Sequence, residues 1–192
     1  MSKRVLILYS SRHGHTARIA ERLGTALATE GITAIERDVR HAAEELVPSH
    51  YDGVIVGGSV HRGHHDPELL EWLSAHHSTL SLRPSAFFSV SLTAADDTAE
   101  ARGTTQALID DVLDATGWIP SMTAAFAGAL LWREYDLPTR VLMRLIARQH
   151  GEDVDVGRDV VYTDWDAVDR FGHELARRVK RAAAQRAAAA TG

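Results

Sequence analysis

The sequence predicts a doubly wound α/β domain, a three-layer sandwich in which helices cover both faces of a five-stranded parallel sheet of order 2-1-3-4-5. Short apolar runs of strand length alternate with segments of helical periodicity along the chain. Strands that alternate with helices are joined by right-handed crossovers, so they run parallel and their carboxyl ends share one edge. Three of these runs end in loops rich in Gly, Ser and Thr. We therefore expect one domain with a ligand site at that edge.

The composition excludes several classes of protein. The chain has 192 residues, no Cys and a formal net charge of −5. The absence of Cys excludes a disulfide framework, a thiolate zinc site, an iron–sulfur cluster and a cysteine nucleophile. The negative charge argues against a nucleic-acid partner. Since no segment reaches the ~20 apolar residues of a membrane span and no signal peptide precedes the first strand, we expect a cytoplasmic protein.

The first two strands differ in their expected positions in the sheet. Lys3–Ser10 is a continuous run rich in β-branched residues, which is typical of a central strand buried on both faces. A helix is expected to begin at Thr16 and to end at Gly31. Ile32–Val39 contains three consecutive charged residues, and this favours a strand at the sheet edge.

The same alternation predicts the rest of the sheet. Further strands are expected at Asp52–Gly58, Ser85–Leu92 and Met122–Leu131, with helices that begin at Pro67 and span Glu100–Thr116. Each of these helices lies between two strands, as a parallel sheet requires.

An insertion, residues 132–159, separates the fifth strand from the last helix. That helix is expected to begin at Asp166, with a T-x-x-D start signal formed by Thr163 and Asp166. The domain is thus predicted to cover 1–183. The Ala-rich tail, 184–192, is expected to fray because it has no large apolar anchor.

The first loop has the chemistry of a phosphate cradle. Residues 10–16 join the first strand to the first helix, and Ser10, Ser11 and Thr16 offer hydroxyl groups. Gly14 lets the backbone approach a ligand closely, and a helix start offers unpaired N–H groups at the positive end of its dipole. The loop lacks the Gly-Lys-Ser/Thr ending of a P-loop and the dinucleotide pattern G-x-G-x-x-G. The alternative is an ordinary polar turn.

Two further loops are expected at the same edge. Residues 57–64 contain three Gly after a buried strand, and Gly permits positive φ and a close approach of a flat ligand. For residues 57–64 the alternative is a loose turn with a chance cluster of His. Ser91–Ala94 forms the third loop. His61, His64 and His65 are interpreted as solvated loop residues, and no metal is expected, because their spacing matches no metal motif.

Five segments carry a resemblance to a known family. Val5–Thr16 resembles the FMN phosphate loop of flavodoxins. Together with 59–64, 84–92, 127–130 and 160–165, it resembles the flavodoxin-type, quinone-dependent protoporphyrinogen IX dehydrogenases of bacterial haem synthesis, over about Lys3–Arg178. The resemblance implies a flavodoxin-like fold and an FMN cofactor. The implied phosphate contacts are Ser10, Ser11, Arg12, His13, Gly14, His15 and Thr16, and the implied isoalloxazine contacts are Ser59, Val60, His61, Arg62, Gly63, Ser91, Leu92, Thr93 and Ala94.

The activity that the resemblance implies is oxidation of protoporphyrinogen IX to protoporphyrin IX, with electrons passed to a membrane quinone, menaquinone, and so to the respiratory chain. The flavin is expected to carry the redox chemistry in a pocket with few nearby cations, which would keep it strongly reducing. No side chain is assigned as a catalytic base, and no oligomeric state is predicted. The alternatives are a flavodoxin-type electron carrier or small NAD(P)H/quinone reductase, and a module that has lost its flavin and only binds partners.

Two positions depart from the family pattern. Arg62 stands where the second loop usually has an aromatic residue, and His13 where the first loop commonly has an acidic one. The flavin ring is therefore expected to stack on His61 or Arg62, or to leave one face open to a flat substrate.

The insertion contains a predicted helix, Leu137–Gln149, with arginines on one stripe beside a broad apolar arc. One interpretation is a helix packed on the core with snorkelling arginines. The other is an interfacial helix on anionic lipid at the inner face of the cell membrane, near a quinone pool. The resemblance implies that this segment belongs to the substrate or membrane face. Its candidate contact residues are Trp132, Arg140, Arg144 and Arg148, and its arginines are suited to substrate propionates.

Overall fold

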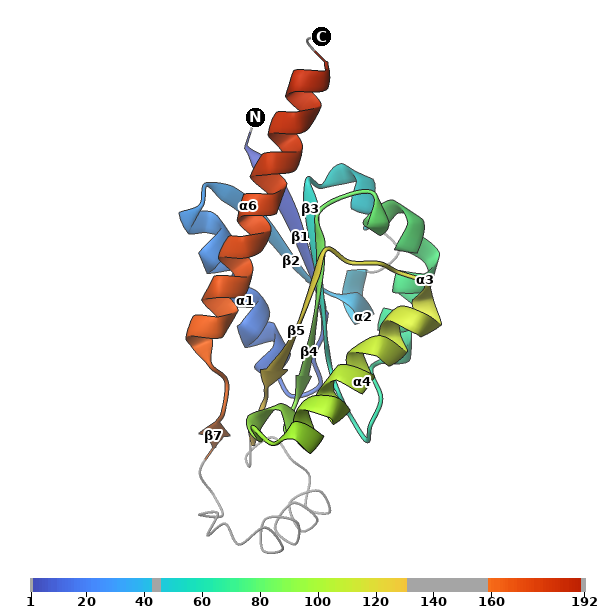
Figure 1. The fold of residues 1–192 in the computed structure, drawn as a ribbon, viewed down its shortest axis with the longest axis vertical. Coiled ribbons are helices and arrows are strands. Elements are labelled where there is room, and N and C mark those ends of the chain that lie inside the picture. Colours follow the sequence, from blue (N-terminus) through green and yellow to red (C-terminus); the bar gives the residue numbers. More distant parts are fainter. Residues whose placement is uncertain (1, 43–45, 131–158, 191–192) are drawn as a thin grey trace, which may run out of the picture.

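The computed structural model describes residues 2–42, 46–130 and 159–190. A five-stranded parallel sheet forms its middle layer, in the order β2-β1-β3-β4-β5 (Figure 1). This is the predicted order, so the expected fold class is confirmed. The strands are β1 (Lys3–Ser10), β2 (Ile32–Asp38), β3 (Gly53–Ser59), β4 (Ser85–Ser91) and β5 (Met122–Ala127).

Helices cover both faces of the sheet, with α1 and α6 on one face and α3 and α4 on the other (Figure 1). Short helical turns lie in the connections between these elements. The helices are α1 (His15–Thr29), α2 (Val39–Ala42), α3 (Pro67–Ser81), α4 (Ala99–Thr116) and α6 (Trp165–Ala189), and the 3₁₀ turns are η2 (Pro48–His50) and η3 (Thr93–Ala95).

The central strand β1 separates two apolar clusters. Val5 and Ile7 pack with the cluster under α1 and α6, while Leu6 and Leu8 pack with the cluster under α3 and α4. All four side chains are fully buried. Alternate residues of a strand point to opposite faces, so a continuous apolar run is what a strand covered on both sides needs. The expected edge position of β2 is also confirmed, because it pairs only with β1 among the described strands.

The predicted fifth strand, Met122–Leu131, is wrong in its second half. The ladder to β4 ends at Ala127, where the N–H of Gly128 bonds instead to the carbonyl oxygen of Ser91 at 2.9 Å. The chain then forms β6 (Ala129–Leu130), which pairs antiparallel with β7 (Val160–Val161) in a separate two-stranded sheet. The partner of β6 therefore lies beyond the insertion, where local sequence pattern gives no signal.

The last helix differs from the prediction at both ends. Asp164, and not Thr163, caps α6, because its carboxylate accepts the N–H of Ala167 at 3.0 Å. The helix also continues to Ala189, beyond the expected end at 183, which agrees with the high helix propensity of Ala. The fraying of the tail stays a prediction.

Four residues that were predicted to form the substrate or membrane face lie outside the described residues: Trp132, Arg140, Arg144 and Arg148. None of the helices in the described part is long and apolar enough to cross a membrane.

Candidate functional site

Three loops meet at the carboxyl edge of the sheet, as predicted. Parallel pairing brings Ser10 of β1 beside Gly58 of β3, and Gly58 beside Ser89 of β4. The loops that follow these strands therefore leave the sheet side by side. The expected site residues of the described chain all belong to these three loops or to the strand and helix ends that hold them.

The first loop ends in an open helix start. Gly14 is the N-cap of α1, with a left-handed φ of 74°, and no side chain caps the helix. A Cβ at Gly14 would have no atom within 4 Å, so the space beside the turn is open. The first backbone N–H groups of a helix have no intrahelical acceptor and lie at the positive end of its dipole. This arrangement fits a phosphate group.

The hydroxyls of this loop are buried, and two of them contact protein groups. Ser10 Oγ donates to Asp66 Oδ2 at 2.7 Å, and Ser11 Oγ accepts the N–H of Ala17 at a long 3.4 Å. Thr16 is also buried, in the first turn of α1. The Ser10 proton is thus directed to Asp66, which leaves Ser11 and Thr16 as the better candidates to donate to an anion.

His15 connects the first loop to the last part of the chain. Its ring is buried, and its Nε2 lies 2.7 Å from Thr163 Oγ1. Since that hydroxyl donates to the carbonyl oxygen of Ala127 at 2.6 Å, Nε2 is the donor in the bond to Thr163. Burial, and then the charge of Arg18, lower the pKa of His15. Nδ1 has no hydrogen-bond partner among the described residues.

The second loop is a tight hairpin and not the loose turn that was the alternative. The N–H of His61 bonds to the carbonyl oxygen of His64 at 2.8 Å, and the reverse bond is 3.1 Å long. Between them, Arg62 has φ 50° and Gly63 has φ 82°. Two central residues with positive φ define a type I′ turn, so the need for Gly at 63 is explained. Val60 precedes the hairpin, and its N–H donates to the carbonyl oxygen of Val90 at 2.8 Å.

The other two glycines of this loop have a different role from the one predicted. Gly57 and Gly58 lie inside β3, without positive φ. A Cβ at Gly57 would lie 1.9 Å from Phe88 Cζ, and one at Gly58 would lie 2.8 Å from Leu69 Cδ2. These glycines therefore allow close packing of neighbouring side chains against β3.

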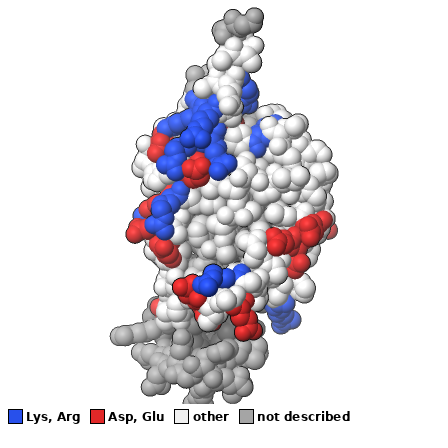
Figure 2. Space-filling view, viewed as in Figure 1, with Lys and Arg blue, Asp and Glu red and all other residues white. Residues whose placement is uncertain are grey.

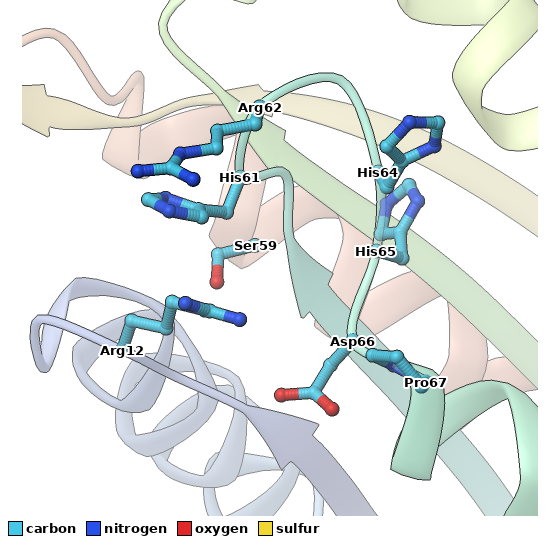
Figure 3. A pocket seen from close by; sticks show the side chains of 8 residues that line it. All are labelled: Arg12, Ser59, His61, Arg62, His64, His65, Asp66 and Pro67. Atoms are coloured by element: carbon cyan, nitrogen blue, oxygen red, sulfur yellow. The ribbon is translucent and has the colours of Figure 1, made fainter.

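A cavity of about 510 Å³ opens between the first and second loops (Figure 3). Its cationic groups come from both loops, which contradicts the expectation of few nearby cations. Arg12 and Arg62 have no ion pair with any described residue. Burial, and then the charges of Arg12, Arg62 and His13, lower the pKa of His61. The cavity is lined by Arg12, Ser59, His61, Arg62, His64, His65, Asp66 and Pro67.

The histidines of this loop differ in exposure. His64 is exposed, as predicted, but His65 is buried, so its assignment as a solvated residue is wrong. His65 Nε2 lies 3.0 Å from Ser89 Oγ, and the ring contacts the edge of Phe87. Burial lowers the pKa of His65 to about 4, so the ring is neutral near pH 7. In the described residues, no group of three or more His, Asp or Glu side chains is placed to hold a metal ion.

The third loop turns immediately after β4. Ser91 is buried, and its Oγ accepts the N–H of Ala94 at 3.3 Å. Thr93 and Ala94 lie in η3, and Leu92 precedes that turn. Thr93 is exposed, while Leu92 and Ala94 are half-buried. The loop thus presents both hydroxyl and apolar side chains next to the second loop, since β4 pairs with β3.

The fold and these loops define the class: a flavodoxin-like α/β protein whose candidate site loops lie at the carboxyl edge of the sheet. A model of the Flavodoxin domain matches residues 6–156. Protoporphyrinogen IX dehydrogenase [quinone] from Leishmania major is 36% identical over 177 residues, 91% of this chain and 75% of the relative. The protein of that name from Escherichia coli (strain K12) is 35% identical over 173 residues, 90% of this chain and 94% of the relative. The chain belongs to the flavodoxin-like family of quinone-dependent protoporphyrinogen IX dehydrogenases, a family of oxidoreductases.

Solved structures support the fold alone. Oxidised Flavodoxin 1 from Bacillus cereus has a TM-score of 0.53 at 16% identity, over 91% of this chain and 98% of the flavodoxin. The flavodiiron core from Synechocystis has a TM-score of 0.57 at 15% identity, over 94% of this chain but 37% of the larger protein.

Proposed function

We propose that the protein is an FMN-dependent enzyme that oxidises protoporphyrinogen IX to protoporphyrin IX and passes the electrons to a membrane quinone, menaquinone. The observation that carries this proposal is the open start of α1 at Gly14, beside a cavity of about 510 Å³ at the carboxyl edge. Relatives at 35–36% identity over nine-tenths of the chain are named for this substrate and for a quinone, which supports the substrate class.

The residues of the first loop fit the phosphate of FMN. The hydroxyls of Ser11 and Thr16 and the first N–H groups of α1 would hold it, because all are donors or positive dipole ends. The hairpin at His61–His64 and the loop Ser91–Ala94 would hold the ring. When bound, FMN supplies the redox chemistry, while the protein positions it and keeps water from the reacting edge. We assign no side chain as a catalytic base.

An anaerobic assay tests this function. The FMN-loaded protein is mixed with protoporphyrinogen IX and a menaquinone analogue, and porphyrin fluorescence is followed. Fluorescence that requires both protein and quinone is expected. A protein that binds FMN but reduces quinone only with NAD(P)H, or only exchanges electrons with a protein partner, would contradict the proposal. A protein that binds no flavin would identify a module that only binds partners.

The insertion, 132–159, is proposed to serve the substrate or membrane face, through Trp132, Arg140, Arg144 and Arg148. A linker of Gly and Ser in place of residues 132–151 tests this role. We expect quinone-linked oxidation to be lost while FMN content and melting temperature are retained. Full activity of this variant would refute the role, and loss of folding would assign the segment to the core. We also propose a cytoplasmic enzyme that associates with the membrane surface. Measuring quinone-linked oxidation by the intact protein and by the linker variant, with and without anionic vesicles, tests this association.

A further inference from the structure

We propose that Arg12, His61 and Arg62 form a carboxylate-binding site at the mouth of the cavity, which holds an acidic side chain of the porphyrinogen apart from the FMN phosphate. This inference rests on the proposed function for its substrate. It concerns side chains from two different loops that the fold brings to one opening.

The three side chains line one cavity. His61 and Arg62 extend from the hairpin toward the same side, and Arg12 lies opposite them on the first loop, with Ser59 in between (Figure 3). The charges are close enough for Arg12 and Arg62 both to disfavour protonation of His61. Positive groups that gather around a cavity create a potential that attracts an anion.

No carboxylate of the described protein neutralises this positive cluster. Asp66 is the sole acidic residue of the cavity lining, and it accepts Ser10 Oγ at 2.7 Å and the N–H of Glu68 at 3.1 Å. Two other arginines show the contrast: Arg22 forms an ion pair with Asp169, and Arg40 with Asp38, each at 2.5 Å. Arg12 and Arg62 have no such partner among the described residues, so their hydrogen-bond donors are available to a ligand.

The conformation of Arg62 also indicates a use for its side chain. Its φ of 50° lies in the left-handed region, where Gly and Asn are favoured and other residues carry a conformational cost. Such costs concentrate at ligand sites. An arginine there presents a planar fork of donors at the cavity mouth, a geometry that matches a carboxylate.

The ligand chemistry follows from what each part of the site offers. The start of α1 offers backbone N–H groups and hydroxyls, which suit the FMN phosphate. Arg12 and Arg62 offer paired donors on long side chains at the opening, where a bound porphyrinogen would have its ionised edge. A porphyrinogen carries propionate groups at one edge and an apolar face elsewhere, so this site would fix which edge enters.

The test compares a diacid with its ester. The probes are protoporphyrin IX and its dimethyl ester in a mild non-ionic detergent, with binding followed by porphyrin fluorescence at saturating FMN. The variants are Arg12→Gln, Arg62→Asn and the double substitution; Asn tolerates the left-handed φ at position 62. Arg181→Gln is the matched control, because Arg181 of α6 is exposed and has no ion pair with any residue that the structure describes.

We expect each substitution to raise the Kd of the diacid about tenfold and to change the Kd of the ester less than about twofold. The KM for porphyrinogen should rise as well, because a contact to the bound substrate is lost. Unchanged diacid affinity, or an equal loss for diacid and ester, would overturn the carboxylate site. A second titration is made below saturating FMN. A loss of diacid affinity that appears only there would also overturn the site, since the arginines would then act only through the phosphate.

The experiment distinguishes failure of the proposed function from failure of the carboxylate site. If the wild-type protein oxidises porphyrinogen and the variants do so with unchanged KM, the carboxylate site is wrong and the function stands. If the wild-type protein binds neither the diacid nor the ester and forms no porphyrin, the proposed function is wrong, and the substrate named for this site falls with it.

Discussion

His15 Nε2 donates to Thr163 Oγ1 across 2.7 Å, although the two residues are 148 positions apart in the chain. The Thr163 hydroxyl in turn donates a hydrogen bond to the carbonyl oxygen of Ala127, at the end of β5. One hydroxyl therefore joins the first loop of the site to the strand before the insertion and to the segment after it. The buried ring also packs against Trp165 at the start of α6, with ring centroids 5.9 Å apart.

Removal of this hydroxyl should destabilise the domain. Thr163→Val keeps the shape of the side chain but leaves the buried His15 N–H without its acceptor. We expect the free energy of unfolding to fall by about 1–3 kcal/mol, the usual cost of an unsatisfied buried donor. Urea denaturation measures it. Thr104→Val is the control, because Thr104 is exposed and bonds only within its own helix. A Thr163→Val variant as stable as that control would contradict the role of this bond.

His65 should make stability depend on pH. The folded protein holds His65 neutral, with a pKa of about 4, whereas an unfolded His takes up a proton below about 6.5. The unfolded state therefore binds more protons in this window, so the free energy of unfolding falls as the pH is lowered from about 6.5 to 4. The titration of His65 lowers the free energy of unfolding over this range by at most about 3 kcal/mol.

The His65→Gln variant tests this pH dependence, because Gln can bond to Ser89 but does not titrate. Its stability should fall less steeply between pH 6.5 and 4. Urea midpoints at a series of pH values measure the slope. His64→Gln, at the exposed neighbour, is the control. Equal slopes in wild type and His65→Gln would show that His65 is not the group responsible.

The first loop should contribute most of the FMN affinity. Thr16→Ala removes a hydroxyl at the start of α1, and we expect FMN binding to weaken by about 1–3 kcal/mol, the range for a charge-assisted hydrogen bond. Quenching of FMN fluorescence gives the affinity. Thr25→Ala removes an exposed hydroxyl from the same helix and should have no effect on affinity. If neither Thr16→Ala nor Ser11→Ala changes the affinity, the phosphate assignment is wrong.

Two Gly→Ala substitutions should have opposite effects on stability. An added Cβ meets no atom within 4 Å at Gly63 or at Gly103, so only backbone preferences differ. Gly63 has φ 82°, and Ala should cost about 1–2 kcal/mol there. Gly103 lies inside α4, where Ala should add about 1 kcal/mol. Thermal unfolding compares the two variants. A neutral Gly63→Ala would contradict the turn assignment, and a destabilising Gly103→Ala would contradict the expected gain in helix propensity.

The sheet could be predicted because its signals are local. The apolar run Val5–Leu8 requires cover on both faces, and the charges of β2 favour an edge. Because the crossover between two parallel strands is right-handed, few spatial orders of the five strands remain possible. Gly14 and Thr16 were likewise found from their place between a strand and a helix. The split of the fifth strand was missed, because Ala129 pairs with Val161, a residue beyond the insertion.

The site needed the tertiary structure. The sequence by itself determined the strand order and the loops at one edge, since these depend on periodicity and on residues a few positions apart. It did not determine that Thr163 accepts from His15 instead of capping α6, or that His65 is buried beside Ser89. It did not determine that Arg12 and Arg62 share one cavity. Hydrogen bonds, burial and charge act through space, so only the folded chain decides which distant residues they join.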